Sequence, residues 1–289
     1  MPRSGTAGLG IVLYLAGVAL FALNDALGNW LVADYGVGQL MLLRSIGAGI
    51  VLAPMIPSLR VKVIDPRRPW LQGLRVLCAA VDTFAFYYAT RTMPLADVMT
   101  FYMATPLITT ALSALLLGEK VERFRWIAVL IGFLGVLIAL RPSPHMFSWG
   151  APIALFGATS FALSQTLTRE LRGIHWLPLV FWQFVGGGLI GAATVPWAWT
   201  TPGFFDLALM FLVGVVAMAC FICIVRALAL APASVLAPLQ YSAILWAAIL
   251  GWLVWRDAPT LPIIVGNAII IGSGLYVAAR GKMIGQTVE

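Results

Sequence analysis

GIVLYLAGVALFALNDAL, residues 10–27, has a second copy in GAPIALFGATSFALSQTL, residues 150–167. The two segments align without a gap at an offset of 140 residues, with identity at Gly10/Gly150, Leu15/Leu155, Gly17/Gly157, Phe21/Phe161, Ala22/Ala162, Leu23/Leu163 and Leu27/Leu167. Further along, residues 94–120 resemble residues 231–257, and GVLIALR at 135–141 matches GLYVAAR at 274–280. Similarity at a nearly fixed offset indicates that the chain contains one structural unit twice.

The composition places both copies in a lipid bilayer. Of the 289 residues, 61% are hydrophobic and only 10% are charged, and the mean hydropathy is +0.96. Apolar segments of about 20 residues, the length that crosses a bilayer core about 30 Å thick, recur down nearly the whole chain. The pattern is typical of a polytopic helical membrane protein and excludes an ordinary soluble domain. The first apolar run is longer than a signal-peptide core, so we expect it to be retained.

Breaks at proline, glycine and charge clusters divide the chain into ten expected helices. Their ranges are 9–33, 37–56, 69–91, 95–117, 124–141, 149–168, 176–198, 204–230, 233–255 and 260–280. Each copy is therefore a five-helix unit, the first over residues 9–141 and the second over 149–280. Because five is odd, the second unit begins on the opposite side of the membrane. The sequence predicts an all-α fold of two inverted five-helix repeats, a construction typical of secondary transporters.

The basic residues predict the orientation. Of the 18 Lys and Arg, twelve fall on the side of the N-terminus, three fall on the other side, and Arg44, Arg75 and Arg226 lie within helices. Cytoplasmic segments carry the excess of Lys and Arg, so both termini are predicted to be cytoplasmic. The net charge of +7 is explained by this bias, and we expect the lipid bilayer rather than nucleic acid as the partner. The predicted location is the cytoplasmic (inner) membrane, in multi-pass form and as a monomer.

The sequence contains few of the features expected of an enzyme. Cys78, Cys220 and Cys223 all lie in apolar runs, which argues against a disulfide framework or a zinc site. His145 and His175 fall beside loops on opposite sides, and no Walker, HExxH or GxSxG sequence is present. We therefore expect no catalytic residues, no metal and no cofactor. An intramembrane enzyme acting on a lipid is a distant alternative.

Two segments resemble a known family. FALNDALGNWL at 21–31, followed by GVGQLMLLR at 36–44, is similar to the first two helices of the EamA-type branch of the drug/metabolite transporter superfamily. PLADV at 94–98 with TPLITTALSALLLGEK at 105–120 resembles the fourth helix and GE turn of that family. The resemblance covers both halves and implies ten helices in two inverted units. Within the family the chain looks most like bacterial exporters of amino acids, including aromatic ones. The second copy has TrpArgAsp at 255–257 where a GE turn is common, so no function is assigned to Glu119.

Charged groups inside spans are the first candidates for a site. Asp25 and Arg44 lie at similar depths on neighbouring helices, and we favour a structural ion pair over a substrate or proton site. Asp82 lies near the middle of its helix, where it either binds a substrate amine or a proton, or is a buried carboxyl bonded to a neighbouring helix. Asn24 and its repeat counterpart Ser164 are expected to face a central cavity.

The fourth and ninth expected helices carry polar residues at matching depths. Tyr102 and Thr105 belong to a polar stripe that Pro106 interrupts, and such breaks are tolerated where freed backbone groups line a cavity. Gln240, Tyr241 and Trp246 occupy the corresponding part of the ninth helix beside Pro238. These residues complete the predicted substrate site, although Ser, Thr and similar side chains also bond helices together in membranes.

The predicted function is a secondary transporter that exports a small metabolite, most simply an aromatic or neutral amino acid, by alternating access. The alternative within transport is an importer or exchanger of a nucleoside-like or cationic metabolite. Acidic residues sit in the first unit, where Asp25 aligns with Gln165 and Asp82 with Ala219 of the second. Such asymmetry suits an asymmetric substrate.

Overall fold

The computed structural model describes residues 4–63, 68–93, 95–141, 149–197, 199–255 and 261–286, and these residues form helices and short connections. The first half contains α1 (Ser4–Asp34), α2 (Val37–Leu59), α3 (Pro69–Thr92), α4 (Leu95–Tyr102), α5 (Thr105–Leu117) and α6 (Arg123–Leu140). The second half contains α7 (Gly150–Glu170), α8 (Trp176–Thr194), η2 (Val195–Trp197), α9 (Phe204–Leu230), α10 (Ala233–Leu236), η3 (Ala237–Tyr241), α11 (Ser242–Trp255) and α12 (Leu261–Gln286). Arg256, predicted on the outer side, lies outside the described residues.

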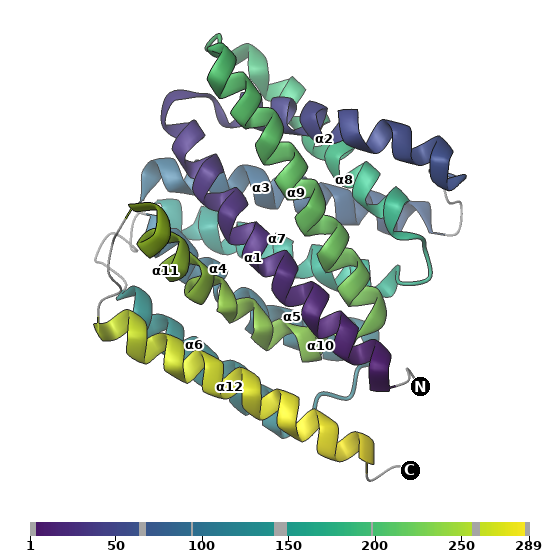
Figure 1. The fold of residues 1–289 in the computed structure, drawn as a ribbon, viewed down its shortest axis with the longest axis vertical. Coiled ribbons are helices and arrows are strands. Elements are labelled where there is room, and N and C mark those ends of the chain that lie inside the picture. Colours follow the sequence, from purple (N-terminus) through teal and green to yellow (C-terminus); the bar gives the residue numbers. More distant parts are fainter. Residues whose placement is uncertain are drawn as a thin grey trace.

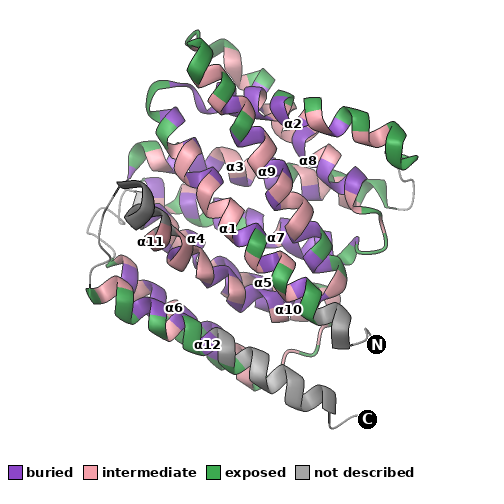
Figure 2. Ribbon diagram, viewed as in Figure 1, coloured by how far each residue is buried: buried purple, intermediate pink, exposed green. Residues whose placement is uncertain are grey.

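Helices from the two halves pack on one another in pairs. α1 packs along α9 and α3 along α7, and in Figure 1 the second pair lies behind the first. α2 packs on α8 at one end of the long axis, and α6 packs on α12 at the other. The purple, buried faces of these helices in Figure 2 point toward their partners, while the outer faces of α6 and α12 carry exposed residues.

Six of the described helical segments are long and apolar enough to cross a bilayer: Gly8–Asp34, Val37–Leu59, Asp97–Leu117, Arg123–Leu140, Trp176–Trp197 and Phe204–Leu230. α3 has 24 residues, a sufficient length at 1.5 Å per residue, but the charged Arg75, Asp82 and Arg91 lower its hydropathy. The chain is therefore a multi-pass membrane protein.

Two helices of the bundle are broken near prolines. α4 ends at Tyr102 and α5 begins at Thr105, with Pro106 in its first turn. Proline has no N–H, so the Tyr102 carbonyl loses its usual helical partner. In the second half the helix tightens into the 3-10 segment η3, which contains Pro238. The breaks allow each segment to change direction beside the centre of the bundle.

Many hydroxyl groups of the helices are satisfied by the backbone of their own helix. The hydroxyls of Ser45, Thr83, Thr110 and Thr166 each donate to a backbone carbonyl one turn earlier, at 2.7–3.0 Å. Buried Arg75 donates to Gln183 Oε1 at 3.0 Å and to the Leu179 carbonyl, which fastens α3 to α8. Such bonding is required where no water can replace a missing partner.

Close helix contacts depend on glycine. A Cβ placed on Gly214 of α9 would lie 1.9 Å from the carbonyl oxygen of Arg44 and 3.0 Å from the amide nitrogen of Ala48, both backbone atoms of α2. On the opposite side of the bundle, a Cβ on Gly266 of α12 would lie 2.5 Å from the Gly135 carbonyl of α6. Small residues at these crossings allow membrane helices to pack by backbone contact.

We predict that Gly214→Ala will destabilise the protein, because the added methyl group meets backbone atoms that cannot rotate away. The expected loss is about 1–3 kcal/mol, as for other overpacked contacts. Thermal unfolding of the detergent-solubilised protein measures it as a lowered melting temperature. Gly49→Ala in α2 is the matched control, since nothing lies within 4 Å of its Cβ position. Equal melting temperatures for the two variants would contradict the packing argument.

Candidate functional site

A cavity of about 680 Å³ lies between the paired helices. Its longest wall is one face of α1, where Tyr14, Val18, Phe21, Asp25 and Asn29 follow one another at intervals of three or four residues. The remaining wall comes from α3, α4, α7, α9, η3 and α11, together with Arg44 from α2 and Leu140 from α6. The cavity is therefore lined by helices from both halves of the chain.

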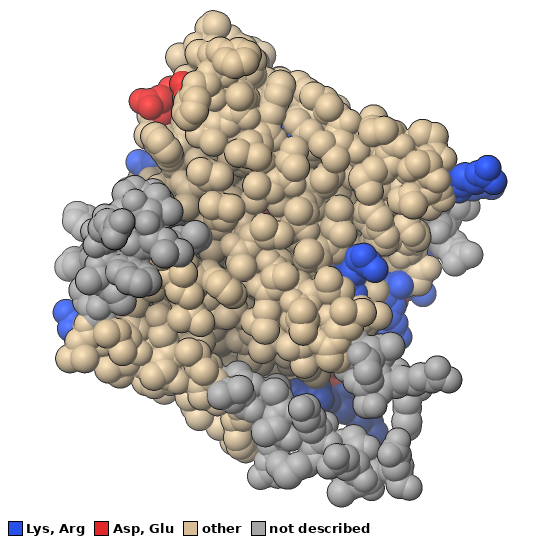
Figure 3. Space-filling model, viewed as in Figure 1, with Lys and Arg blue, Asp and Glu red and all other residues tan. Residues whose placement is uncertain are grey.

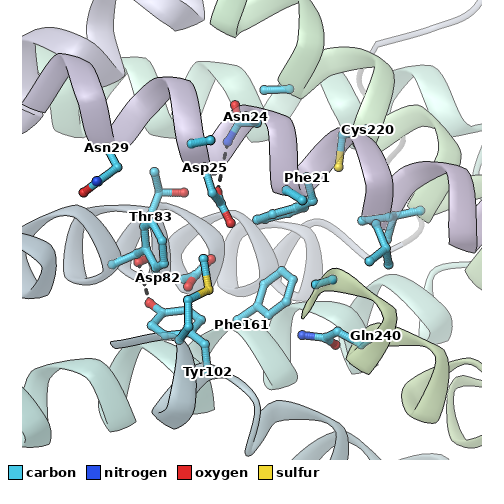
Figure 4. Close-up of a pocket in the computed structure, with 18 of the residues that line it drawn as sticks. Phe21, Asn24, Asp25, Asn29, Asp82, Thr83, Tyr102, Phe161, Cys220 and Gln240 are labelled. Carbon is cyan, nitrogen blue, oxygen red and sulfur yellow. Dashed lines mark hydrogen bonds between the residues drawn. The ribbon is translucent and has the colours of Figure 1, made fainter. Parts of the chain in front are cut away.

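The acidic part of the cavity is formed by α1 and α3. Asn24 Nδ2 donates to Asp25 Oδ1 at 3.2 Å, and both residues are buried. Across from them, as Figure 4 shows, the Tyr102 hydroxyl donates to the backbone carbonyl of Asp82 at 3.1 Å. Asn24 Oδ1 and Asp82 Oδ1 receive no hydrogen bond from the described residues. The site therefore has unused acceptors.

Aromatic rings divide this acidic part from the Gln240 end. The rings of Phe21 and Phe161 are 5.6 Å apart between centroids, with an angle of 55° between their planes. The Phe221 ring lies 6.1 Å from that of Phe21 in an edge-on arrangement. In Figure 4 the Phe21–Phe161 pair stands between Asp25 and Gln240. Such rings favour contact with a flat or apolar part of a ligand.

A buried hydrogen-bond network closes the cavity near Gln240. The Tyr14 hydroxyl donates to Gln165 Oε1 at 3.0 Å and lies 3.4 Å from Gln240 Oε1. Gln165 Nε2 donates to Gln240 Oε1 at 3.2 Å. The network joins α1, α7 and η3, so it ties elements from both halves of the chain. We call it the inner tier.

A second network, the outer tier, lies one helical turn further along α7. The Glu119 carboxylate accepts from the amide nitrogens of Ala233 and Ser234 at 3.3 and 3.2 Å, and from the Ser234 hydroxyl at 2.8 Å. Arg169 Nε lies 3.5 Å from Glu119 Oε1, and its Nη1 donates to the Leu228 carbonyl at 2.7 Å. Arg125 Nη1 donates to the Ser234 hydroxyl at 2.9 Å. Glu119, to which the sequence assigned no function, thus holds the beginning of α10.

The structure brings four of the eight predicted substrate residues to the cavity: Asn24, Asp82, Tyr102 and Gln240. The other four do not line it. Thr105 and Ser164 donate to the carbonyls of Ala158 and Arg75 at 3.5 and 3.3 Å. The Tyr241 hydroxyl donates to the Val129 carbonyl at 3.1 Å, and Trp246 packs against the cluster around Tyr14 and Val18. In this conformation those side chains bond or pack between helices.

The predicted ion pair between Asp25 and Arg44 is not formed as a direct contact. Among the described residues, ion pairs within 4 Å join Arg68 to Glu170 and Arg169 to Glu119. Asp25 and Arg44 instead both line the cavity. Placing two charged groups at similar depth on adjacent helices did not determine whether their side chains meet.

Several cavity residues were missed by the sequence reasoning. Tyr14, Phe21 and Asn29 share the face of α1 that carries Asp25, so the helical period was the signal that could have found them. Thr83 and Phe161 had no comparable signal. No group of three or more His, Cys, Asp or Glu that could hold a metal ion occurs within the described part of the chain.

Comparison with known proteins agrees with a transport site. An S-adenosylmethionine uptake transporter of Rickettsia prowazekii is 23% identical, over 94% of this chain and 93% of the relative. A riboflavin transporter of Rhizobium johnstonii is 26% identical over 92% and 89% of the two chains. A pseudopaline exporter of Pseudomonas aeruginosa is 24% identical over 91% and 93%. None of these three is named as an amino acid exporter, so that likeness is not supported.

The fold and the family agree. A solved structure titled only as a crystal structure of a protein superimposes with a TM-score of 0.82 at 16% identity, over 94% of this chain and 98% of the other. The model of the EamA-like transporter family matches residues 8–141 and again residues 148–279. The chain belongs to the EamA-like transporter family.

Proposed function

We propose that the protein is a secondary transporter of the cytoplasmic membrane that carries a small metabolite through the central cavity by alternating access. The observation that carries the proposal is a central cavity lined by charged and aromatic side chains, with a buried hydrogen-bond network at one end. Tyr14 and Gln240 lie at that end, and Trp30, near the other end of α1, also lines the cavity and has 61% of its surface exposed. A site reached from one side at a time is the basis of alternating access.

Inverted repeats with ten membrane spans are part of the proposal, and the helix pairing supports them. Exchanging the two halves converts the α1–α9 pair into α7–α3, and converts α2–α8 and α6–α12 into themselves. A twofold axis between the repeats produces this pattern. Two near-equivalent packings of such units would open the cavity to either side in turn.

Cytoplasmic termini are supported by the charge distribution. The N- and C-termini lie near each other in Figure 1, and the Lys and Arg visible in Figure 3 gather mostly toward that edge. The excess of positive charge belongs on the cytoplasmic side. Both tiers then close the cytoplasmic end, and the conformation faces outward.

The charges of the cavity favour a cationic, nucleoside-like substrate over a neutral amino acid. Asp25 and Asp82 supply two carboxylates and Arg44 one guanidinium, so a ligand with a net positive charge would balance the set. S-adenosylmethionine, the substrate named for the Rickettsia relatives, has such a charge and a flat base. Export of an aromatic amino acid is the second candidate, favoured by the Phe21–Phe161 pair.

We predict that proteoliposomes containing the purified protein will take up labelled S-adenosylmethionine faster than liposomes without protein. Riboflavin, phenylalanine and leucine tested under the same conditions, with and without a pH gradient, complete the panel. Movement of the amino acids alone would select the second candidate. Failure of all four to move faster than in empty liposomes would contradict the proposed transport of these substrates.

We predict that Glu119→Gln will shift the protein toward a conformation open to the cytoplasm. The substitution replaces the charge-assisted hydrogen bonds that Glu119 makes with Ser234 and Arg169. Each such bond stabilises this conformation by up to about 1.5–3 kcal/mol. The readout is an Ala26→Cys reporter in the cavity wall of a cysteine-free variant, labelled by a membrane-impermeant maleimide. In membrane vesicles of each orientation, labelling should rise from the cytoplasmic side and fall from the outside, by about tenfold in ratio for each 1.4 kcal/mol.

Glu170→Gln is the matched control for this experiment. Glu170 lies on the same end of α7 and pairs with exposed Arg68, but it takes no part in either tier. Its labelling ratio should match that of the unmodified reporter. Unchanged labelling in Glu119→Gln would remove the outer tier as a gate, and a shift in the opposite sense would reverse the assigned sidedness.

A further inference from the structure

Arg44 is a charged cavity residue that the protein itself does not neutralise by direct contact. Its side chain is buried, with 7% of the residue exposed, and it is the residue of α2 that lines the cavity. Its backbone is fixed, because the Arg44 carbonyl packs directly on Gly214 of α9. The helix crossing therefore fixes the backbone position from which the Arg44 side chain reaches the cavity.

The hydrogen-bond donors around Arg44 exceed the acceptors. Within the described residues, no carboxylate oxygen lies within 4 Å of the guanidinium, which can donate five hydrogen bonds. The Tyr87 hydroxyl, which also lines the cavity, lies near the Arg44 guanidinium and the Asn24 side chain. It packs against Gly28, where a Cβ would come within 2.1 Å of it. A buried cation without a bound anion is costly in a membrane protein, which marks Arg44 as a residue for a ligand.

Elsewhere in the cavity, hydrogen-bond acceptors lack donors among the described residues. Asp82 Oδ1 and Asn24 Oδ1 receive no hydrogen bond from the described residues, and the Tyr102 hydroxyl donates to the backbone carbonyl of Asp82. Asp25 is bonded to Asn24 rather than to Arg44. Asp25, Asp82 and Arg44 thus line one cavity without a direct ion pair among them, although such a pair would be the more stable arrangement in the absence of a ligand.

We propose that Arg44, with the Tyr87 hydroxyl beside it, binds the carboxylate of the substrate, while Asp82 accepts its ammonium group. The substrate class is then a molecule with an α-amino acid head, that is, a carboxylate and an ammonium on one carbon. The rest of the molecule lies toward the Phe21–Phe161 pair. This inference rests on the proposed transport function and makes Arg44 a residue that determines specificity rather than a structural one.

The test compares ligands that differ only in the carboxylate. Binding to the detergent-solubilised protein is measured as the ligand-induced rise in melting temperature over a concentration series. The probes are S-adenosylmethionine with its decarboxylated analogue, and phenylalanine with phenethylamine. The unmodified protein should bind one carboxylate form at least about tenfold more tightly than its partner, as expected for a charge-assisted contact. Arg44→Gln should lose that preference and keep the affinity for the form without the carboxylate.

Two further variants distinguish recognition of the substrate carboxylate by the charge of Arg44 from a general effect on folding. Arg44→Lys retains the charge and should retain part of the preference, because a lysine cannot bind a carboxylate bidentately. Arg226→Gln removes an exposed arginine of α9 and should behave as the unmodified protein. Retained binding of the decarboxylated form shows that Arg44→Gln is folded.

The outcomes distinguish this inference from the proposed function. Absence of a carboxylate preference in the unmodified protein, or equal weakening of both forms by Arg44→Gln, overturns the role of Arg44. A clear preference that Arg44→Gln abolishes supports that role even if proteoliposomes move none of the probes, in which case the proposed transport of these substrates fails and the binding site stands.

Discussion

The need to satisfy every polar group without water governs this molecule. Backbone groups are satisfied by helices, and hydroxyls such as those of Ser45 and Thr110 return to carbonyls of their own helix. Helices approach through glycine at Gly214 and Gly266 because, with apolar lipid around them, close packing replaces the hydrophobic effect as the source of contact energy. Among the described residues with a buried polar atom that has no hydrogen-bond partner, Asp82, Asn24 and Tyr87 line the cavity, whereas others, such as Gln72, Thr109 and Asn267, lie elsewhere in the bundle. The first three are therefore the ones placed where a ligand could reach them.

Much of the helical framework could be predicted from the sequence, because hydropathy, proline and glycine act locally. The helix break near Pro106 and membership of the family could both be predicted, because the sequence patterns that indicate them do not depend on the direction of side chains. The same reasoning identified only part of the cavity, since four of the eight predicted substrate residues line it. Asn24 and Asp82 were identified as isolated polar groups in apolar helices, whereas Thr105 and Tyr241 lie close to helix breaks, where the helical period no longer tells which face a residue occupies.

The pair Asp25 and Arg44 illustrates the same limit. Depth and adjacency of helices led us to favour a structural ion pair, whereas in the structure both residues line the cavity without a direct contact. The position of Arg44 depends on the crossing of α2 with α9 at Gly214. That crossing joins residues far apart in the chain. Glu119 was similarly undervalued, since its partners Ala233 and Ser234 belong to the other half.

The spacing of Gln165 and Arg169 on one face of α7 has a consequence for leakage. Each residue belongs to a different tier, so water or an ion crossing this end would meet the buried inner tier and the partly buried outer tier in series. A thermal fluctuation that frees one side chain leaves the other seal intact. In the proposed transport cycle, a movement of α7 as a whole would break both networks together, so opening of this end would be cooperative. A single helix would then limit leakage while the proposed transporter changes conformation.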